Sequence, residues 1–149
     1  MATALIIYGS DTGNTQAVAE FIEETISGDY DVTVEDCADL DSSVFEDSYD
    51  VIFMGCSTWG VEPPEMQEDM EDFIDQLDED EVDLSGAKFG IFGCGDDSYP
   101  HFGEAVKMMS DRVAERGAEV LNTGIRICDP WEDHEDEIKD WVEDALSNL

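Results

Sequence analysis

Residues 4–15 read ALIIYGSDTGNT, an apolar run that passes into a turn rich in hydroxyl and amide side chains. An amphipathic stretch follows over residues 17–26. The order strand, turn, helix directs backbone N–H groups and the positive end of a helix dipole at one point, which suits a phosphate group. Side-chain donors in the turn come from Ser10, Thr12, Asn14 and Thr15. The stretch therefore predicts a phosphate-binding loop.

This turn contains neither Lys nor Arg. It is therefore not the loop of a nucleoside-triphosphate-binding protein, whose pattern is GxxxxGK[ST]. A phosphate monoester held by neutral donors fits the turn better. The alternative interpretation is an ordinary polar turn that caps a helix, and the rest of the chain has to decide between the two.

The length of 149 residues and a hydrophobic content of 42% predict one domain, residues 1–149, with a substantial core. No apolar run approaches the roughly 18 residues that a membrane-spanning helix needs. The start of the chain, MATA, lacks the basic region of a signal peptide. We expect a cytoplasmic protein without membrane insertion.

The charge is strongly negative, because 40 Asp and Glu stand against 6 Lys and Arg, for a formal net charge of −34. Such a surface repels nucleic acid and anionic membranes, and it favours partner proteins with basic faces. The small number of lysines also resembles adaptation to high salt, which screens the repulsion among the carboxylates. A stability curve against salt concentration tests that hypothesis.

The four cysteines show no CxxC spacing, so they are interpreted as free thiols and not as a disulfide framework or a zinc site. No metal site is expected elsewhere. The acidic run over residues 78–81 is interpreted as an exposed loop. The cysteines are Cys37, Cys56, Cys94 and Cys128.

Apolar runs alternate along the chain with segments of helical periodicity. This alternation predicts an α/β fold with an open, doubly wound parallel sheet and helices on both faces. Residues 41–49 are either a short helix or a loop. The predicted strands are 3–8, 31–35, 51–55, 89–93 and 119–121, the last with an extension toward 127. The predicted helices are 14–27, 65–77, 103–116 and 132–146.

Two further loops lie where a ligand of this fold would bind, at the carboxyl ends of the third and fourth strands. Residues 56–64 read CSTWGVEPP and residues 93–102 read GCGDDSYPHF. Each loop carries one large aromatic side chain, Trp59 or Tyr99, which is poorly placed in solvent unless something flat covers it. The pair suggests a slot for a planar ring system. The alternative is that each aromatic packs against its own loop.

Three motifs, taken in order on one alternating chain, resemble the flavodoxin family over the whole length of the sequence. They are YGSDTGNT at 8–15, GCSTWG at 55–60 and FGCGDDSY at 92–99. The fifth strand has no long insertion near 121–125, which is similar to the short-chain flavodoxins of sulfate-reducing bacteria. The resemblance implies the three-layer flavodoxin-like fold, with a five-stranded parallel sheet whose order, 2-1-3-4-5, is taken from that family.

The resemblance also implies non-covalently bound FMN. Its phosphate would lie on residues 10–15, with Ser57 and the indole N–H of Trp59 closing over it. Trp59 would cover the inner face of the flavin ring and Tyr99 the outer face. The residues implied in binding are Ser10, Asp11, Thr12, Gly13, Asn14, Thr15, Ser57, Thr58, Trp59, Gly60, Gly93, Cys94, Gly95, Asp96, Tyr99, His101, Phe102 and Gly103.

Finer roles follow from the same resemblance. Asp96 would lie near the ribityl chain and the pyrimidine, and its N–H would meet the pyrimidine edge together with the N–H of Gly103 and the carbonyl of His101. The negative side chain of Asp11 is expected to point outward, which leaves its N–H for the phosphate. Cys94 is not expected to be a redox-active thiol, because it has no basic neighbour in the sequence.

The implied function is a low-potential carrier of single electrons that cycles FMN mainly between neutral semiquinone and anionic hydroquinone. The Gly60–Val61 peptide would flip so that the Gly60 carbonyl accepts a hydrogen bond from N5–H of the semiquinone, a rotation that glycine tolerates. The sequence suggests no cation near the ring. Unit charges about 4 Å apart repel by about 4 kcal/mol at a dielectric constant of about 20, which would make the second reduction difficult.

Redox proteins with basic docking faces are the expected partners, and a monomer suits a diffusing carrier. The alternative is an FMN-dependent NAD(P)H:quinone reductase on the same fold. Such an enzyme usually needs basic residues for the nicotinamide cofactor, and this chain has few. A receiver-type signalling domain is excluded, because Gly9-Ser10 and Cys56-Ser57 stand where it needs carboxylates. No catalytic residue is expected in a carrier.

Overall fold

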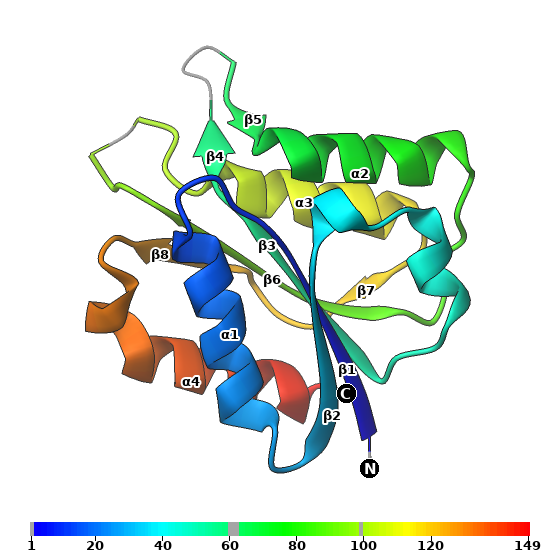
Figure 1. The fold of residues 1–149 in the computed structure, drawn as a ribbon, viewed down its shortest axis with the longest axis horizontal. Helices are drawn as coiled ribbons and strands as arrows, with labels where there is room; N and C mark the ends of the chain where they lie inside the picture. The colour runs from blue at the N-terminus through cyan, green and yellow to red at the C-terminus, as the bar shows by residue number, and fades with distance from the viewer. Residues whose placement is uncertain (1, 60–62, 99) are drawn as a thin grey trace.

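The computed structural model describes residues 2–59, 63–98 and 100–149, and its main sheet is parallel throughout the described pairs (Figure 1). The strands of this sheet are β1 (Ala2–Gly9), β2 (Tyr30–Asp36), β3 (Val51–Cys56), β6 (Lys88–Gly95), β7 (Glu119–Val120) and β8 (Ile125–Cys128). Their order is β2-β1-β3-β6-β7, and β8 also pairs with β6. The predicted order 2-1-3-4-5 is therefore confirmed.

The fifth position of the sheet is shared by two short strands, where the sequence predicted one strand with an extension. The connecting residues run close to β6. The N–H of Leu121 still donates to the carbonyl of Phe89 at 2.8 Å. A Cβ atom at Gly124 would lie 2.9 Å from the carbonyl oxygen of Ile91, so only glycine fits between the two regular pairings.

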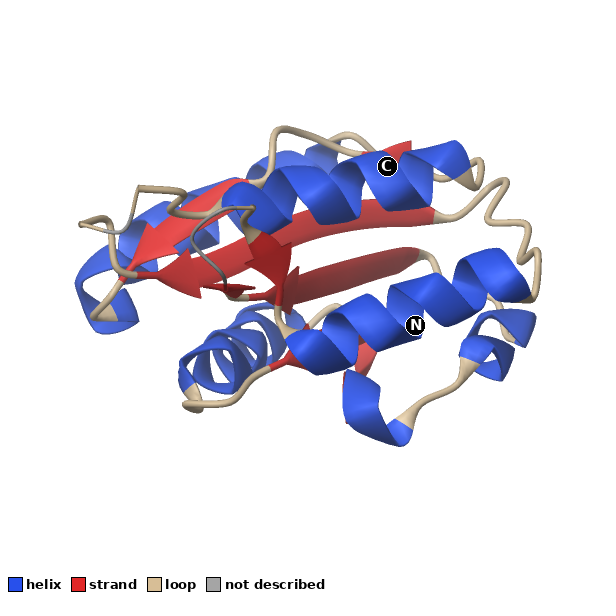
Figure 2. Cartoon of the chain, turned by 90° about the horizontal axis from the view of Figure 1, so that it is seen from above, coloured by secondary structure: helices blue, strands red, loops and turns tan. Residues whose placement is uncertain are grey.

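Helices cover both faces of the sheet and make three layers (Figure 2). One face carries α1 (Asn14–Ile26) and α4 (Glu135–Ser147), and the other carries α2 (Glu68–Glu79) and α3 (Glu104–Glu115). Single turns of 3-10 helix complete the connections: η1 (Cys37–Asp39), η2 (Ser42–Glu46) and η3 (Trp131–His134). Residues 41–49 thus contain a short helix, one of the two alternatives left by the sequence.

Two cores result from the alternation of side chains along the buried strands. On β1, Leu5 and Ile7 face α2 and α3, whereas Ala4 and Ile6 face α1 and α4. Every residue of β3 is buried, as expected for a parallel strand with helices on both sides. The continuous apolar runs of the sequence therefore correspond to the centre of the sheet.

A small hairpin, absent from the prediction, follows β3. It pairs β4 (Thr58–Trp59) with β5 (Glu65–Met66) in antiparallel fashion. Helix α2 consequently begins at Glu68, three residues later than predicted, because 65–66 belong to β5. Within the described residues, no helix has the length and apolar character needed to cross a bilayer.

Candidate functional site

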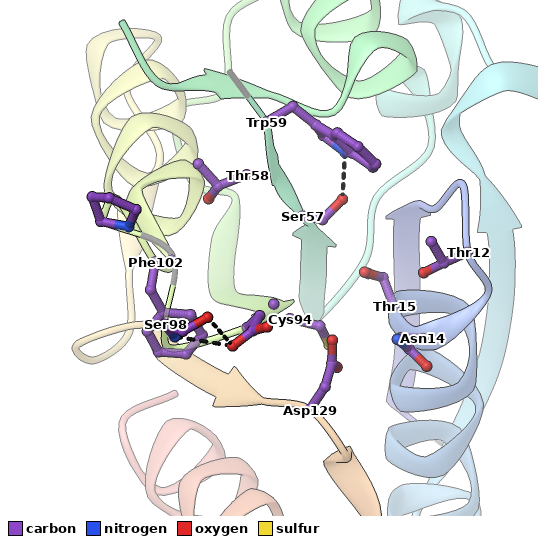
Figure 3. Close-up of a pocket in the computed structure, with 14 residues that line it drawn as sticks. Thr12, Asn14, Thr15, Ser57, Thr58, Trp59, Cys94, Ser98, Phe102 and Asp129 are labelled. Carbon is purple, nitrogen blue, oxygen red and sulfur yellow. Dashed lines mark hydrogen bonds between the residues drawn. The ribbon is translucent and has the colours of Figure 1, made fainter. Parts of the chain in front are cut away.

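A cavity of about 630 Å³ lies at the carboxyl ends of the central strands, where the loops after β1, β3, β6 and β8 converge (Figure 3). Parallel strands place these loops at one edge of the sheet, which is the usual ligand position in such folds. The residues that line the cavity are Thr12, Asn14, Thr15, Ser57, Thr58, Trp59, Cys94, Gly95, Asp96, Ser98, Pro100, Phe102, Gly103 and Asp129.

Most of the predicted site residues line this cavity. Five others belong to the same segments without lining the cavity: Ser10, Asp11, Gly13, Gly93 and His101. The predictions for Gly60 and Tyr99 fall outside the described residues.

Three lining residues were missed by the sequence reasoning. Ser98 and Pro100 lie inside the loop that the sequence singled out, so that loop was the signal for them. Asp129 follows β8, and its only signal was the expectation that the fifth strand ends at the same edge of the sheet. The missed residues show that the loop after the last strand also contributes to the site.

The N-terminus of α1 opens toward the cavity without a side-chain cap. Gly13 precedes the helix with φ 93°, a left-handed conformation that favours glycine. The N–H of Gly13 donates to Ser10 Oγ at 2.9 Å, which closes the turn. The N–H groups of the first helical turn have no partner four residues earlier in the helix, so a ligand can accept from them.

Acidic side chains are absent from the first turn of α1, a segment that the structure describes in full. The first turns of α2 and α4 each carry three: Glu68, Asp69 and Glu71 in α2, and Glu135, Asp136 and Glu137 in α4. Carboxylates stabilise a helix N-terminus by complementing its dipole. Their exclusion from α1, in a chain with 40 acidic residues, leaves this terminus open to a different anion.

Behind this terminus lies Thr15, which is only 2% exposed. Its hydroxyl lies by the thiol of Cys94 and lowers the pKa of that thiol, whereas burial raises it and is the larger effect. Burial raises the pKa of Cys94 to about 12, so the thiol stays protonated at neutral pH. The expectation that Cys94 is not redox-active stays a prediction.

The β4–β5 hairpin places an aromatic ring at the mouth of the cavity. Trp59 is 44% exposed, and its indole N–H donates to Ser57 Oγ at 2.8 Å (Figure 3). The hydroxyl of Thr58 accepts from the N–H of Ala105 at 2.8 Å, which ties the hairpin to the start of α3. The indole is thus oriented by hydrogen bonds while much of its surface remains uncovered.

The loop after β6 carries an ordered carboxylate. Asp96 Oδ1 accepts from the backbone N–H of Ser98 at 2.9 Å and from its hydroxyl at 2.8 Å. These bonds hold the pKa of Asp96 below its usual value, so the side chain is ionised at neutral pH. The site therefore contains a negative charge on this side.

A cation lies closer to this loop than the sequence suggested. The Arg126 guanidinium donates to the carbonyl of Phe102 at 3.0 Å and lies 4.0 Å from Glu104 Oε2. A Cβ atom at Gly103 would lie 2.5 Å from Cδ of Arg126, so the arginine packs directly on the start of α3. β8 carries Arg126 beside this loop, whereas the expectation of no cation near the ring itself stays a prediction.

At the edge of the cavity, Asp129 is joined to β6 by its N–H, which donates to the carbonyl of Gly95 at 2.8 Å. Loss of water around its carboxylate raises the pKa of Asp129, and the nearby charges of Asp96 and Glu132 raise it further. Within the described residues, no group of His, Cys, Asp and Glu could hold a metal ion.

Comparison with known proteins identifies this arrangement. Residues 6–141 match the family model for flavodoxin. The chain belongs to the flavodoxin family. The flavodoxin of Maridesulfovibrio salexigens is 37% identical over 143 residues, which cover 95% of this chain and 94% of that protein. The resemblance stated from the three sequence motifs is thereby confirmed.

Solved flavodoxin structures show the same fold. Oxidised flavodoxin 2 from Bacillus cereus superimposes with a TM-score of 0.89 at 32% identity, covering 99% of this chain and 100% of that one. A Fusobacterium nucleatum flavodoxin, solved bound to flavin mononucleotide, gives a TM-score of 0.85 at 17% identity and covers 100% of this chain and 99% of that one. The central parallel sheet with its helical layers, as in Figure 1, is therefore the flavodoxin fold.

Proposed function

We propose that this flavodoxin carries single electrons at low potential with non-covalently bound FMN, and that residues 1–149 form one FMN-binding domain. Members of the family are electron-transfer proteins and not enzymes, so the carrier is favoured over a quinone reductase. The FMN-bound structure of the Fusobacterium nucleatum flavodoxin supports the choice of cofactor.

The observation that carries the proposal is the uncapped, acid-free N-terminus of α1 at the cavity wall. Its backbone N–H groups and the hydroxyl and amide groups of Thr12, Asn14 and Thr15 form a set of neutral donors. A phosphate monoester suits this set, because it can accept many hydrogen bonds and complements the helix dipole. The donor chemistry of the cavity therefore fits the phosphate of FMN.

Other residues of the cavity lining fit a planar ring. The half-exposed indole of Trp59 offers an aromatic face, and Gly95 and Gly103 expose backbone groups to the cavity without side chains. Stacking against Trp59 would remove both the ring and the indole from water. The roles of Tyr99 and Gly60 rest on the family resemblance, since both lie outside the described residues.

FMN supplies the redox chemistry when it is bound, and we propose that it cycles mainly between its one-electron-reduced and fully reduced states. The chain contributes an ionised carboxylate at Asp96 and a net charge of −34, which disfavour additional negative charge at the site. Arg126 opposes this effect on one side of the loop. The potential is therefore set by a balance of charges that can be varied one at a time.

Redox proteins with basic docking faces are the partners that this surface favours, and the carrier is expected to act as a monomer. The cytoplasmic location stays a prediction from the sequence. We also propose that salt stabilises the fold, because it screens repulsion among the 40 acidic residues. Unfolding temperatures that stay equal in dilute buffer and in molar salt would contradict this proposal.

The decisive experiment is a titration of the apoprotein with FMN, followed by flavin fluorescence and the visible spectrum. Binding should quench the emission and give a yellow protein. Stepwise anaerobic reduction should then produce the long-wavelength absorption of the one-electron-reduced flavin, and Gly60→Pro should diminish it. A protein that stays colourless and leaves the emission unquenched would overturn the proposal.

A further inference from the structure

Gln67 is a fully buried polar residue, 0% exposed, at the junction of β5 and α2. Among the described residues, the buried polar or charged side chains are this glutamine and Thr15, which lines the cavity. Gln67 itself does not line the cavity. Burying an amide is unfavourable unless its hydrogen bonds are satisfied, so its partners indicate what it does.

The side chain of Gln67 joins two segments that are distant in sequence. Nε2 donates to Asp11 Oδ1 at 3.0 Å and to Asp69 Oδ2 at 3.0 Å, and Oε1 accepts from the N–H of Met70 at 3.0 Å. Its backbone N–H donates to the carbonyl of Ser57 at 3.0 Å. The residue thus contacts the loop after β1, the loop after β3 and the first turn of α2.

The end of β1 is shaped to admit this side chain. A Cβ atom at Gly9 would lie 2.3 Å from Oε1 of Gln67, which is far inside contact distance. Glycine at this position therefore leaves space for the Gln67 amide, which bonds to Asp11 in the loop after β1. A side chain at this position would have to displace the amide, so glycine at the end of β1 and the buried glutamine fit each other.

The bond to Asp11 has a consequence for the ligand. Asp11 is the one acidic side chain in the turn 10–15, next to Thr12 on the cavity wall. An ionised carboxylate that turned into the cavity would repel a phosphate dianion and compete with it for the N–H groups of α1. In the structure its Oδ1 is bonded to Gln67, and Asp11 is not part of the wall.

We propose that Gln67 is a positioning residue that holds the Asp11 carboxylate outside the phosphate site. This inference rests on the proposed function, since it concerns the phosphate of FMN. A neutral amide suits the task, because both of its N–H groups can donate to carboxylates without placing a charge in the core. The selectivity of the site for a phosphorylated flavin then depends on a residue that does not touch the ligand.

The test compares FMN with riboflavin, which has the same ring system and no phosphate. Gln67→Met keeps the size of the side chain and removes the donor to Asp11. We expect the affinity for FMN to fall roughly 5- to 20-fold while the affinity for riboflavin changes much less. Adding Asp11→Asn should restore most of the loss, because the released side chain would then be neutral.

The comparison of Gln67→Met in the wild-type chain and in the Asp11→Asn variant forms a double-mutant cycle that isolates the coupling between the two side chains. Met70→Ala is the matched control, because it weakens the same turn of α2 without removing the donor to Asp11. It should lower the unfolding temperature and leave the ratio of FMN to riboflavin affinity as in the wild type.

Equal losses of FMN and riboflavin affinity in Gln67→Met, or no recovery with Asp11→Asn, would overturn the inference and leave Gln67 with a role in folding alone. A wild-type protein that binds no FMN would instead overturn the proposed function. Dissociation constants from fluorescence quenching distinguish these two failures, and the unfolding temperature of each apoprotein reports the effect on the fold separately.

Discussion

The two sides of the cavity present different kinds of side chain. The tail side consists of the turn 10–15 and Gln67 behind it. The ring side consists of Trp59, residues 95–98 and residues 100–103, together with Arg126, which packs on Gly103 outside the cavity lining. The tail side presents neutral donors, and its one carboxylate is bonded to a buried amide. The ring side presents an exposed aromatic, an ionised carboxylate and a cation.

Under the proposed function, this difference follows from the part of FMN that each side would bind. A phosphate carries a fixed charge, so oriented N–H groups and a helix dipole can hold it without a counter-charge from a side chain. A flavin ring changes its charge when it is reduced, so the charges around it alter the potential. The tail side should therefore control selectivity for the phosphate, and the ring side should control affinity for the ring and its redox behaviour.

The largest expected effect is that of Trp59→Ala on the ring side. Loss of the aromatic face should lower the affinities for FMN and for riboflavin alike by roughly 30-fold, corresponding to about 2 kcal/mol of binding free energy. Trp59→Phe, which keeps a ring, should retain more of the affinity. Quenching titrations measure both ligands, and unchanged affinity in Trp59→Ala would mean that the indole packs only on its own loop.

A smaller effect is expected from Thr15→Val on the tail side. The substitution keeps the shape of the side chain and removes one donor. It should lower the affinity for FMN roughly 10-fold and leave the affinity for riboflavin unchanged. Thr25→Val is the control, because the Thr25 hydroxyl donates to the carbonyl of Phe21 within the same helix. If Thr15→Val lowers the affinities for FMN and riboflavin equally, the tail side does not control selectivity for the phosphate.

Arg126→Gln should change the potential more than the affinity. Removing this cation should make the second one-electron reduction more difficult, with a midpoint lower by roughly 30–60 mV, up to a tenfold change in the equilibrium. Lys139→Gln removes the same charge from α4, where the amine lies over Phe21 at 5.7 Å. Potentiometric titration of both variants separates a local effect from one of net charge. Equal shifts would contradict the local role of Arg126.

The smallest effect is expected from Asp129→Asn and depends on pH. The pKa of Asp129 is raised in the fold, so its ionisation costs stability once the pH exceeds the ordinary carboxyl value of 3.8. The variant should therefore unfold at a higher temperature than the wild type at neutral pH. The difference should vanish below that value, where the carboxyl is protonated in the folded and the unfolded chain.

Asp140→Asn controls for the loss of one negative charge, because it removes an exposed carboxylate on α4. Thermal unfolding of the apoproteins across the acidic and neutral range measures both variants. A gain of the same size in Asp140→Asn would attribute the effect to net charge and not to the surroundings of Asp129.

Much of the fold could be predicted from local patterns. The run at 51–54 is continuously apolar, and it became a strand buried along its whole length. The start of α2 was wrong because the apolar spacing of Met66 and Met70 continues a helical pattern through residues that pair with β4 instead. Local periodicity does not contain that antiparallel pairing, which joins Trp59 to Glu65 and Thr58 to Met66.

The sequence by itself determined the polar turn 10–15, because its residues are neighbours in the chain, and the excess of negative charge, because that depends on composition alone. The sheet order came from the resemblance of its motifs to the flavodoxin family. Only the tertiary structure decided that Gln67 bonds to Asp11 and that Arg126 lies beside Phe102. Those pairs come from separate loops and strands. They meet because parallel strands bring their carboxyl ends to one edge, where burial and hydrogen bonding select the partners.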